Sequence, residues 1–393
     1  MSGFDMLVVG AGIFGITAVS ELNARGYKTA VIDPGPLPHP LAASTDISKV
    51  IRIEYGPDEQ YMEMVETALP IWRQWNDELG DTLFHEVGVS MLAKHEMQPG
   101  EFEYESYQML LKRGHQPDRL NPEVIRERFP AWNTDEYVDG YFHKLGGFAE
   151  SGRVVTALAG KAERAGATLI GGEAVIELLV ENGRIQGVKT DQGNQHYADH
   201  VIIAAGAWTH ILLPELAPVM KSSGHPVFHL RPSNLDLFTP PNFVVFTADI
   251  SHSGWYGFPL HPHEKVVKIA NHGVGQQLHP SDDERIVTET DEQTLRQFLA
   301  KTFPTLVDAP IVYTRRCLYC DTLDEHFWID QHPEIEGLSV AAGGSGHGFK
   351  FGPVLGLLIA DAVEEKPNKW LPKFRWRHLS QSNQGEEASR FHG

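Results

Sequence analysis

The sequence predicts an α/β fold in which a domain built on a parallel sheet is interleaved with a second, mainly antiparallel domain. Three features predict it. A strand, a glycine-rich turn and a helix open the chain, a small antiparallel meander follows near its middle, and a second strand–glycine–helix unit lies more than 300 residues after the first. With 393 residues, the chain is long enough for two domains.

The first glycine-rich turn has the spacing of a Rossmann dinucleotide-binding turn. The apolar strand Met6–Val9 leads into Gly10, Gly12 and Gly15. Gly10 permits a tight exit from the strand, and Gly12 has no Cβ, so a pyrophosphate can approach the backbone. Gly15 lets the following helix pack close to the strand, with its N-terminus directed at the phosphates. The turn therefore predicts a bound dinucleotide.

The residue type at the end of the second strand narrows the choice of dinucleotide. The strand Lys28–Ile32 ends at Asp33, about 20 residues beyond the glycines, where a carboxylate accepts hydrogen bonds from a ribose diol. A carboxylate there would repel a 2′-phosphate. Asp33 thus favours NAD or FAD over NADP.

The meander favours FAD over NAD. Strands Val175–Val180 and Arg184–Thr190 are joined at Asn182-Gly183, a strong signal for a two-residue hairpin. Gln192–Asn194 makes the next turn, and 201–206 then returns as a buried strand. A parallel sheet interrupted by such a meander is the layout of the glutathione-reductase-like FAD-binding Rossmann domain, and domains that bind only NAD do not need it.

These patterns divide the chain into interleaved parts. We expect the FAD-binding domain to comprise residues 1–85, 146–215 and 316–375, the antiparallel substrate domain 86–145 and 216–315, and a loose polar tail 376–393. The third part of the FAD-binding domain carries the strand Leu338–Ala342, the glycine-rich turn 343–348 and a helix with Pro353 at its start. Both glycine turns could therefore contact one extended cofactor.

Composition excludes several classes of partner. A net charge of −19 argues against nucleic acid and against an anionic membrane surface. No run of about 18 apolar residues is present to span a membrane. The chain also shows no signal peptide and no peroxisomal or lipidation address, so we expect a cytoplasmic protein.

Two cysteines and the scattered histidines leave metal and dithiol chemistry as minor alternatives. Cys317 and Cys320 cannot form a disulfide framework, and a zinc site would need a second ligand pair. His261 and His263 flank a proline, where hydrogen-bonded or surface histidines are commoner than metal ligands. We therefore expect no metal.

Several segments together resemble a known family. They are Ser48–Arg52, Tyr55-Gly56, 267–272, 317–319 and 345–351. These segments resemble the monomeric sarcosine oxidase family of flavoproteins, which includes oxidases of N-methyl amino acids and pipecolate and the fructosyl-amino acid oxidases (amadoriases). The resemblance runs in the same order from the first strand to the helix after Pro353.

The resemblance implies roles for three residues beside the flavin. Cys317 matches the cysteine that holds FAD covalently through a thioether, which leaves Cys320 without an assigned role. Lys268 matches the lysine that promotes reaction with O₂, and an ammonium near the forming superoxide would lower that barrier electrostatically. Lys49 matches a basic residue near the flavin.

It also implies how an amino-acid substrate is held. Arg52 and Lys350 match the pair that clamps the substrate carboxylate, and two cations there would orient the amine toward the flavin. His272 and Tyr256 fall in the region that lines the substrate cavity. The residues expected to bind FAD are Gly10, Gly12, Ile13, Phe14, Gly15, Asp33, Ser44, Thr45, Lys49, Val175, Gly206, Trp208, Cys317, Gly343, Gly346, His347, Gly348 and Lys350.

The implied function is an FAD-dependent oxidase of a secondary-amine α-amino acid (N-methyl, N-alkyl or cyclic) that passes hydride to the flavin and produces hydrogen peroxide from O₂. Within this class, fructosyl-amino acids and saccharopine-type substrates compete, and the aromatic stretch around Trp255 suggests a bulky side chain. Other classes are an NAD-dependent dehydrogenase and an FAD-binding protein without amine turnover. The resemblance also implies a monomer.

Overall fold

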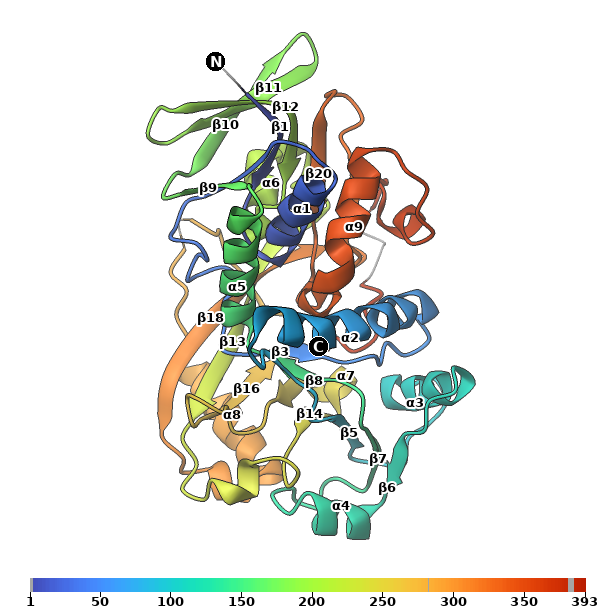
Figure 1. Ribbon diagram of the computed structural model, residues 1–393. Coiled ribbons are helices and arrows are strands. Elements are labelled where there is room, and N and C mark those ends of the chain that lie inside the picture. Colours follow the sequence, from blue (N-terminus) through green and yellow to red (C-terminus); the bar gives the residue numbers. More distant parts are fainter. Residues whose placement is uncertain (1–2, 282, 381–384) are drawn as a thin grey trace.

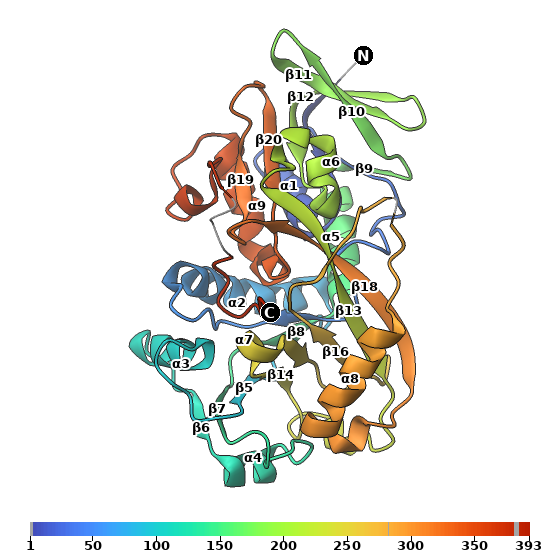
Figure 2. The same ribbon diagram turned by 180° about the vertical axis from the view of Figure 1, so that it is seen from behind.

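In a computed structural model, which describes residues 3–281, 283–380 and 385–393, the chain forms two large sheets and a small one. The parallel sheet lies at one end of the molecule and the antiparallel sheet at the other, and one long helix crosses between them (Figure 1). The view from behind shows the same division (Figure 2). The arrangement confirms the predicted mixture of a Rossmann-type domain and an antiparallel domain.

The first sheet is the predicted parallel sheet with its meander. Its strands are β1 (Phe4–Val9), β2 (Thr29–Asp33), β9 (Thr168–Gly171), β10 (Val175–Glu181), β11 (Arg184–Thr190), β12 (Gln195–Ile203), β19 (Trp328–Gln331) and β20 (Leu338–Ala342). The order β20-β12-β1-β2-β9 is parallel throughout. The first residues of β12 pair with β11, and so the meander grows out of one strand of the parallel sheet.

The second sheet forms the antiparallel domain. Its strands are β5 (Val89–Ala93), β6 (Asp118–Leu120), β7 (Asp139–His143), β13 (Met220–Leu230), β14 (Val245–Ala248), β15 (Trp255–Gly257), β16 (Val267–Asn271), β17 (Gln276–Gln277) and β18 (Ile311–Thr322). A small sheet of β3 (Lys49–Ile51), β4 (Phe84–His85) and β8 (Gly147–Ala149) completes the set. β18 pairs with β13 along its whole length, so residues 316–322, which we assigned to the first domain, are hydrogen-bonded in the second sheet.

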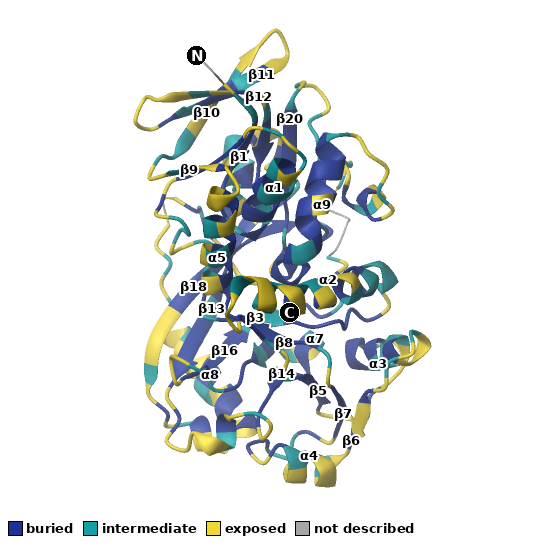
Figure 3. Cartoon of the chain, in the orientation of Figure 1, coloured by how far each residue is buried: buried dark blue, intermediate teal, exposed yellow. Residues whose placement is uncertain are grey.

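Helices cover the sheets. They are α1 (Ile13–Ala24), α2 (Glu59–Leu79), α3 (Phe102–Lys112), α4 (Pro122–Arg128), α5 (Ser151–Arg164), α6 (Thr209–Leu212), α7 (Ile250–Ser253), α8 (Glu289–Thr302) and α9 (Gly352–Val363). Exposed residues lie along α2 and α4, whereas strands such as β5, β14 and β20 are buried (Figure 3).

The long helix α2 shows how local sequence sets the boundaries of an element. The Asp58 carboxylate accepts a hydrogen bond from the Tyr61 amide at its start, and Gly80 ends it in the left-handed conformation. Its apolar stripe, which includes Met62 and Trp72, is buried. The turn of the β10–β11 hairpin is also set by its local sequence, because Asn182 and Gly183 both have the positive φ that such a turn requires.

The polar tail differs from its prediction. We expected it to be loose, but its described end returns to the middle of the molecule (Figures 1 and 2), where Glu387, Ser389 and Arg390 are buried. Polarity suggested solvation, yet these side chains find charged partners inside the protein. Residues 381–384 lie outside the described part. Within that part, no helix is long and apolar enough to cross a membrane.

The close packing of α1 on β1 depends on one glycine. A Cβ at Gly15 would lie 1.8 Å from the carbonyl oxygen of Gly10, which is backbone and cannot rotate away. We expect Gly15→Ala to lower the free energy of unfolding by about 1–3 kcal/mol, the range for overpacking, measured by chemical denaturation.

The matched control is Gly160→Ala in α5, where a Cβ would meet only the mobile end of Arg164. Alanine is the better helix former, so this variant should be unchanged or more stable by about 0.5–1 kcal/mol. Equal stability of the two variants would contradict the packing role of Gly15.

Candidate active site

A long cavity of about 560 Å³ follows the carboxyl ends of the parallel strands. Both glycine-rich turns line it, and the strand order changes direction there, with β12 on one side of β1 and β2 on the other. Ligands of open α/β sheets bind at such a point. The cavity therefore lies where the sequence placed a dinucleotide.

Asp33 holds the first glycine turn in shape. One carboxylate oxygen accepts a hydrogen bond from the Ala11 amide at 2.8 Å, and the other accepts from the Gly35 amide at 3.2 Å. Burial raises the pKa of Asp33, although these two amide donors oppose the shift. Asp33 also lines the cavity, so it remains placed to face a ribose.

The structure brings together most, but not all, of the expected cofactor residues. Those that line the long cavity are Gly10, Gly12, Ile13, Phe14, Asp33, Ser44, Lys49, Val175, Gly206, Trp208, Gly343, Gly346 and Gly348. Gly15, Thr45 and Cys317 do not line it, and His347 and Lys350 line a second, smaller cavity instead.

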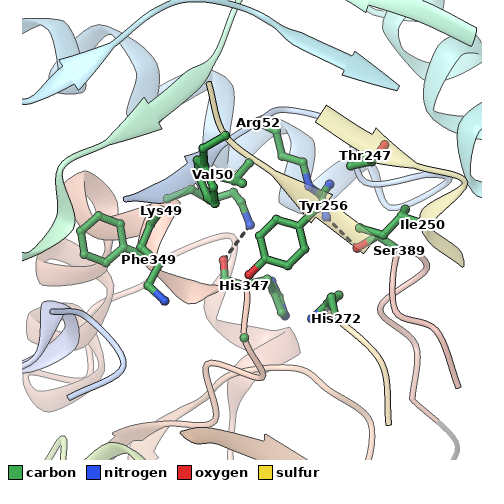
Figure 4. Close-up of a pocket in the computed structure, with 13 residues that line it drawn as sticks. Lys49, Val50, Arg52, Thr247, Ile250, Tyr256, His272, His347, Phe349 and Ser389 are labelled. Carbon is green, nitrogen blue, oxygen red and sulfur yellow. Dashed lines mark hydrogen bonds between the residues drawn. The ribbon is translucent and has the colours of Figure 1, made fainter. Parts of the chain in front are cut away.

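The smaller cavity, of about 50 Å³, adjoins the long one, because Lys49, Gly346 and Phe349 line both. Figure 4 shows side chains from β3, β14, β15, the second glycine turn and the tail converging on it. The residues lining it are Lys49, Val50, Arg52, Thr247, Ile250, Tyr256, Phe258, His272, Gly346, His347, Phe349, Lys350 and Ser389. Four of the five residues expected to act on substrate are therefore in one cavity.

Arg52 is buried at the wall of this small cavity. Its Nη2 donates to Ser389 Oγ at 2.7 Å, drawn as a dashed line in Figure 4, and lies 3.3 Å from a carboxylate oxygen of Glu387. The guanidinium stacks over the rings of Tyr55 and Phe102, at 4.9 and 5.4 Å. Its Nη1 is buried and has no hydrogen-bond partner among the described residues, so one donor remains for a ligand.

Lys350 is the second buried cation. Its ammonium donates to the Tyr55 hydroxyl and to the His347 carbonyl oxygen, both at 2.8 Å. Burial and the neighbouring charge of Arg52 hold the pKa of Lys350 well below its usual range. An incoming carboxylate would favour the charged form, because an opposite charge raises the pKa of an amine.

His272 and Tyr256 supply polar groups to the opposite wall. Burial lowers the pKa of His272, so the ring is neutral at pH 7. Its Nε2 lies 2.9 Å from the Glu387 carboxylate, which only accepts, so the proton sits on Nε2 and Nδ1 carries the lone pair. Burial raises the pKa of Tyr256 above its usual value, and its hydroxyl therefore stays protonated.

Lys268 lies behind the cavity wall rather than in it. Its ammonium donates to the Ser48 carbonyl oxygen and pairs with the Asp46 carboxylate, both at 2.5 Å. Burial lowers the pKa of Lys268 to about 8, against the raising effect of Asp46. The lysine is thus protonated at neutral pH and close to losing its proton in mild base.

The two cysteines face different surroundings on β18. Cys317 packs with Val227, Ala270 and Tyr319, and its Sγ is 3.8 Å from the Lys49 ammonium. Cys320 lines the long cavity, but burial raises the pKa of its thiol to about 12. Because the thiolate is the nucleophile, Cys317 beside a cation is the more reactive candidate.

Sequence reasoning missed several residues of the site. Tyr55 stood in a recognised segment without a role, yet its hydroxyl joins Lys350 to His347. Glu387 and Ser389 stood in a segment read as solvent-exposed. A charged and hydroxyl-bearing stretch at a chain end gives no local signal of burial, so only the fold could place these two.

The packing of Trp255 and His261 bears on two other expectations. The Trp255 ring stacks on Phe298 in the second core, with centroids 4.7 Å apart, whereas Tyr256 and Phe258 of the same aromatic stretch line the small cavity, and the size of the substrate side chain stays a prediction. His261 Nε2 lies 3.2 Å from the Ile47 carbonyl oxygen. Among the described residues, no group of three or more potential ligands is placed to hold a metal ion.

The doubly wound sheet, its glycine turns and the adjoining polar cavity define the class of dinucleotide-binding oxidoreductases. Residues 5–362 match the DAO family of FAD-dependent oxidoreductases, and the chain belongs to that family. The family description names FAD, so it favours FAD over NAD as the cofactor of this chain.

Individual relatives agree with the family. The monomeric sarcosine oxidase of Bacillus sp. (strain B-0618) is 29% identical over 364 residues, which cover 91% of each chain. The L-saccharopine oxidase of Schizosaccharomyces pombe is 26% identical, over 95% of this chain and 93% of its own. The solved structure of amadoriase I, a fructosyl amine:oxygen oxidoreductase from Aspergillus fumigatus, superposes with a TM-score of 0.83 at 25% identity, covering 100% of this chain and 94% of that one.

The residues present fit FAD. Asp33 and both glycine turns line the long cavity, and the second glycine turn also lines the small one. Gly346 has a positive φ, and a Cβ there would lie 2.3 Å from the Tyr319 ring, so the backbone runs close beside this aromatic residue. A cofactor bound along the cavity would have its reactive end next to the buried cations.

Proposed function

We propose that this protein is an FAD-dependent oxidase of a secondary-amine α-amino acid. The observation that carries the proposal is the pair of adjoining cavities. One is lined by both dinucleotide turns and the other holds Arg52 and Lys350, and the two share Lys49, Gly346 and Phe349. An acid-bearing substrate held by the cations would therefore lie beside the cofactor.

The two cations fix the acid end of the substrate. The free Nη1 of Arg52 and the ammonium of Lys350 are donors at the cavity wall, and hydrogen bonds between charged groups are about twice as strong as neutral ones. When the carboxylate is held, the amine can take only a narrow range of positions in front of the cofactor. Binding of the acid end therefore also orients the reacting atoms.

A bound flavin would supply a two-electron acceptor for hydride from the substrate C–H bond beside the nitrogen, which leaves a C=N imine that water hydrolyses, and O₂ would take up the two electrons and two protons as hydrogen peroxide. The amine must be neutral to react, and among the described residues that line the cavity there is no carboxylate to hold it as an ammonium, while Glu387 behind the wall is engaged by Arg52 and His272. Neutral His272, with its lone pair on Nδ1, is an acceptor for the departing amine proton.

The relatives support a secondary amine without choosing one. Sarcosine, saccharopine and fructosyl amines all carry a nitrogen bonded to two carbons, and sarcosine and saccharopine carry a carboxylate on the α-carbon. The named oxidases act on these compounds. We retain fructosyl-amino acids and saccharopine as competing substrates.

A peroxide assay tests the function directly. We expect the FAD-loaded protein to produce hydrogen peroxide from at least one of sarcosine, N-methyltryptophan, pipecolate, proline, saccharopine and fructosyl-valine. Arg52→Gln should raise KM about 10²-fold or more, because it removes a charge-assisted hydrogen bond to a buried carboxylate. A yellow protein that no amine bleaches without oxygen would instead be a flavin binder without turnover.

We further propose that Cys317 holds FAD through a thioether, because its Sγ lies beside the Lys49 ammonium. After acid precipitation, the yellow colour should remain with the wild-type pellet and pass to the supernatant for Cys317→Ala. Cys320→Ala is the control and should keep its colour in the pellet, since that thiol is held protonated by burial. Release of colour from the wild type would rule out the covalent bond.

Lys268 should make the reaction with O₂ depend on pH. Its protonated form would stabilise the negative charge that develops on oxygen, and its pKa is about 8, so the reoxidation rate should fall as pH rises through about 8. Stopped-flow mixing of the reduced enzyme with O₂ measures this rate.

Two variants and a control sharpen the result. The reduced Lys268→Met variant should be reoxidised about 10²–10³-fold more slowly than the wild type, with no change of rate near pH 8. Lys268→Arg keeps its charge, so its reoxidation rate should stay near that of the wild type but should no longer fall near pH 8. Lys221 is an exposed lysine on the otherwise mostly buried β13, and Lys221→Met should behave as the wild type. A step that persists in Lys268→Met would assign it to another group.

A cytoplasmic monomer remains our prediction for location and assembly. Light scattering of the purified protein tests the monomer, and cell fractionation tests the compartment.

A further inference from the structure

The described end of the chain, residues 385–392, forms part of the small cavity. Ser389 lines it, and its hydroxyl accepts a hydrogen bond from Arg52 Nη2 at 2.7 Å (Figure 4). Glu387 lies directly behind, with one carboxylate oxygen 3.3 Å from the same Arg52 nitrogen and the other 2.9 Å from His272 Nε2. The two side chains thus occupy one face of the group expected to clamp substrate.

The segment is anchored on both sides of this contact. Arg390 donates to the Asp321 carboxylate at 2.7 Å and lies 3.1 Å from Glu325, and all three side chains are buried. The Glu387 amide donates to Glu325, and the Phe391 amide donates to the His272 carbonyl oxygen. Displacing the segment would leave buried charges unpaired, which is strongly unfavourable.

We propose that residues 385–392 are a fixed wall of the substrate cavity and that Glu387 is a specificity-determining residue. This rests on the proposed amine oxidase function and names its substrate class, a small secondary amino acid with a single carboxylate. The wall acts through two properties, the volume it leaves and the charge it carries.

The volume of the small cavity limits the size of the substrate side chain. With the segment in place, the cavity measures about 50 Å³, and one water needs about 10–15 Å³ on this measure, so it holds about three to five groups of that size. Sarcosine, the smallest N-methyl amino acid, comes closest to that space, whereas a fructosyl chain or an indole far exceeds it.

The negative charge of Glu387 limits the number of carboxylates that the substrate can carry. Burial alone would raise the pKa of Glu387, but the hydrogen bond from His272 and the charge of Arg52 outweigh it and hold the pKa well below its usual range. Its negative charge takes Nη2 of Arg52 and leaves only Nη1 for the substrate. A second substrate carboxylate near this wall would meet repulsion.

The charge is tested with Glu387→Gln, which keeps the size of the side chain. We expect its kcat/KM for N-methyl-aspartate relative to sarcosine to rise at least about tenfold over the wild type, since one repulsive charge is removed. Glu386→Gln is the matched control, because that neighbouring carboxylate is 60% exposed and faces His326. Its ratio should stay at the wild-type value, and an equal ratio in the two variants would overturn the charge role.

The volume is tested by deleting residues 385–393 from the full chain. The ratio of kcat/KM for fructosyl-valine to that for sarcosine should rise at least about tenfold, because the wall no longer excludes the sugar. If the deletion fails to fold, as judged by circular dichroism and flavin content, Ser389→Gly and Glu387→Ala open the same wall more gently. An unchanged ratio in folded variants would overturn the volume role.

A binding measurement separates this inference from the proposed function. If the wild type oxidises no amine, the function fails, but titration of the flavin absorbance with acetate and with succinate still reports the wall. Glu387→Gln should then tighten succinate relative to acetate, and Glu386→Gln should not. Hydrogen exchange at the Glu387 and Phe391 amides should stay slow when acetate saturates the site. Faster exchange would show that ligand binding displaces residues 385–392, so that they are not a fixed wall.

Discussion

The site depends on holding two cations, Arg52 and Lys350, side by side away from water. Each loses hydration when it is buried, and each repels the other, so the surrounding structure must compensate both. Glu387 and Ser389 take one side of Arg52, while Tyr55 and a backbone carbonyl take the ammonium of Lys350. Nη1 of Arg52 has no hydrogen-bond partner among the described residues, so this nitrogen can donate to a carboxylate.

This constraint explains why distant segments converge. Arg52 directly follows β3, an edge strand of the small sheet, and Lys350 lies in the one-turn helix Gly348–Phe351 after the second glycine turn. Trp72 of α2 donates to the Lys350 carbonyl oxygen at 2.8 Å, which ties the crossing helix to that turn. The charged groups therefore sit where the two large sheets approach each other and where the cofactor cavity ends.

Much of this could be predicted because it is local in the sequence. The turn at Asn182-Gly183, the capped helix α2 and the spacing of Gly10 to Gly15 each follow from a few neighbouring residues. The clustering of Arg52, Lys350, His272 and Tyr256 followed from motif resemblance. The position of Lys268 behind the wall did not, because its partner Asp46 is 222 residues away in sequence and nothing local couples the two.

The tail shows the limit most clearly. Its polarity predicted a loose segment because a charged side chain is buried only when it is paired, and the partners here are distant in sequence: Asp321 is 69 residues from Arg390, and Arg52 is 335 residues from Glu387. The residues of the site accordingly fall into two groups. Arg52, His272 and Lys350 lie in segments that resemble the family's motifs, whereas the proposed wall is built from residues 385–392, which lie outside those motifs. Under this proposal, the sequence of the wall sets the choice of amine while the cations stay in place.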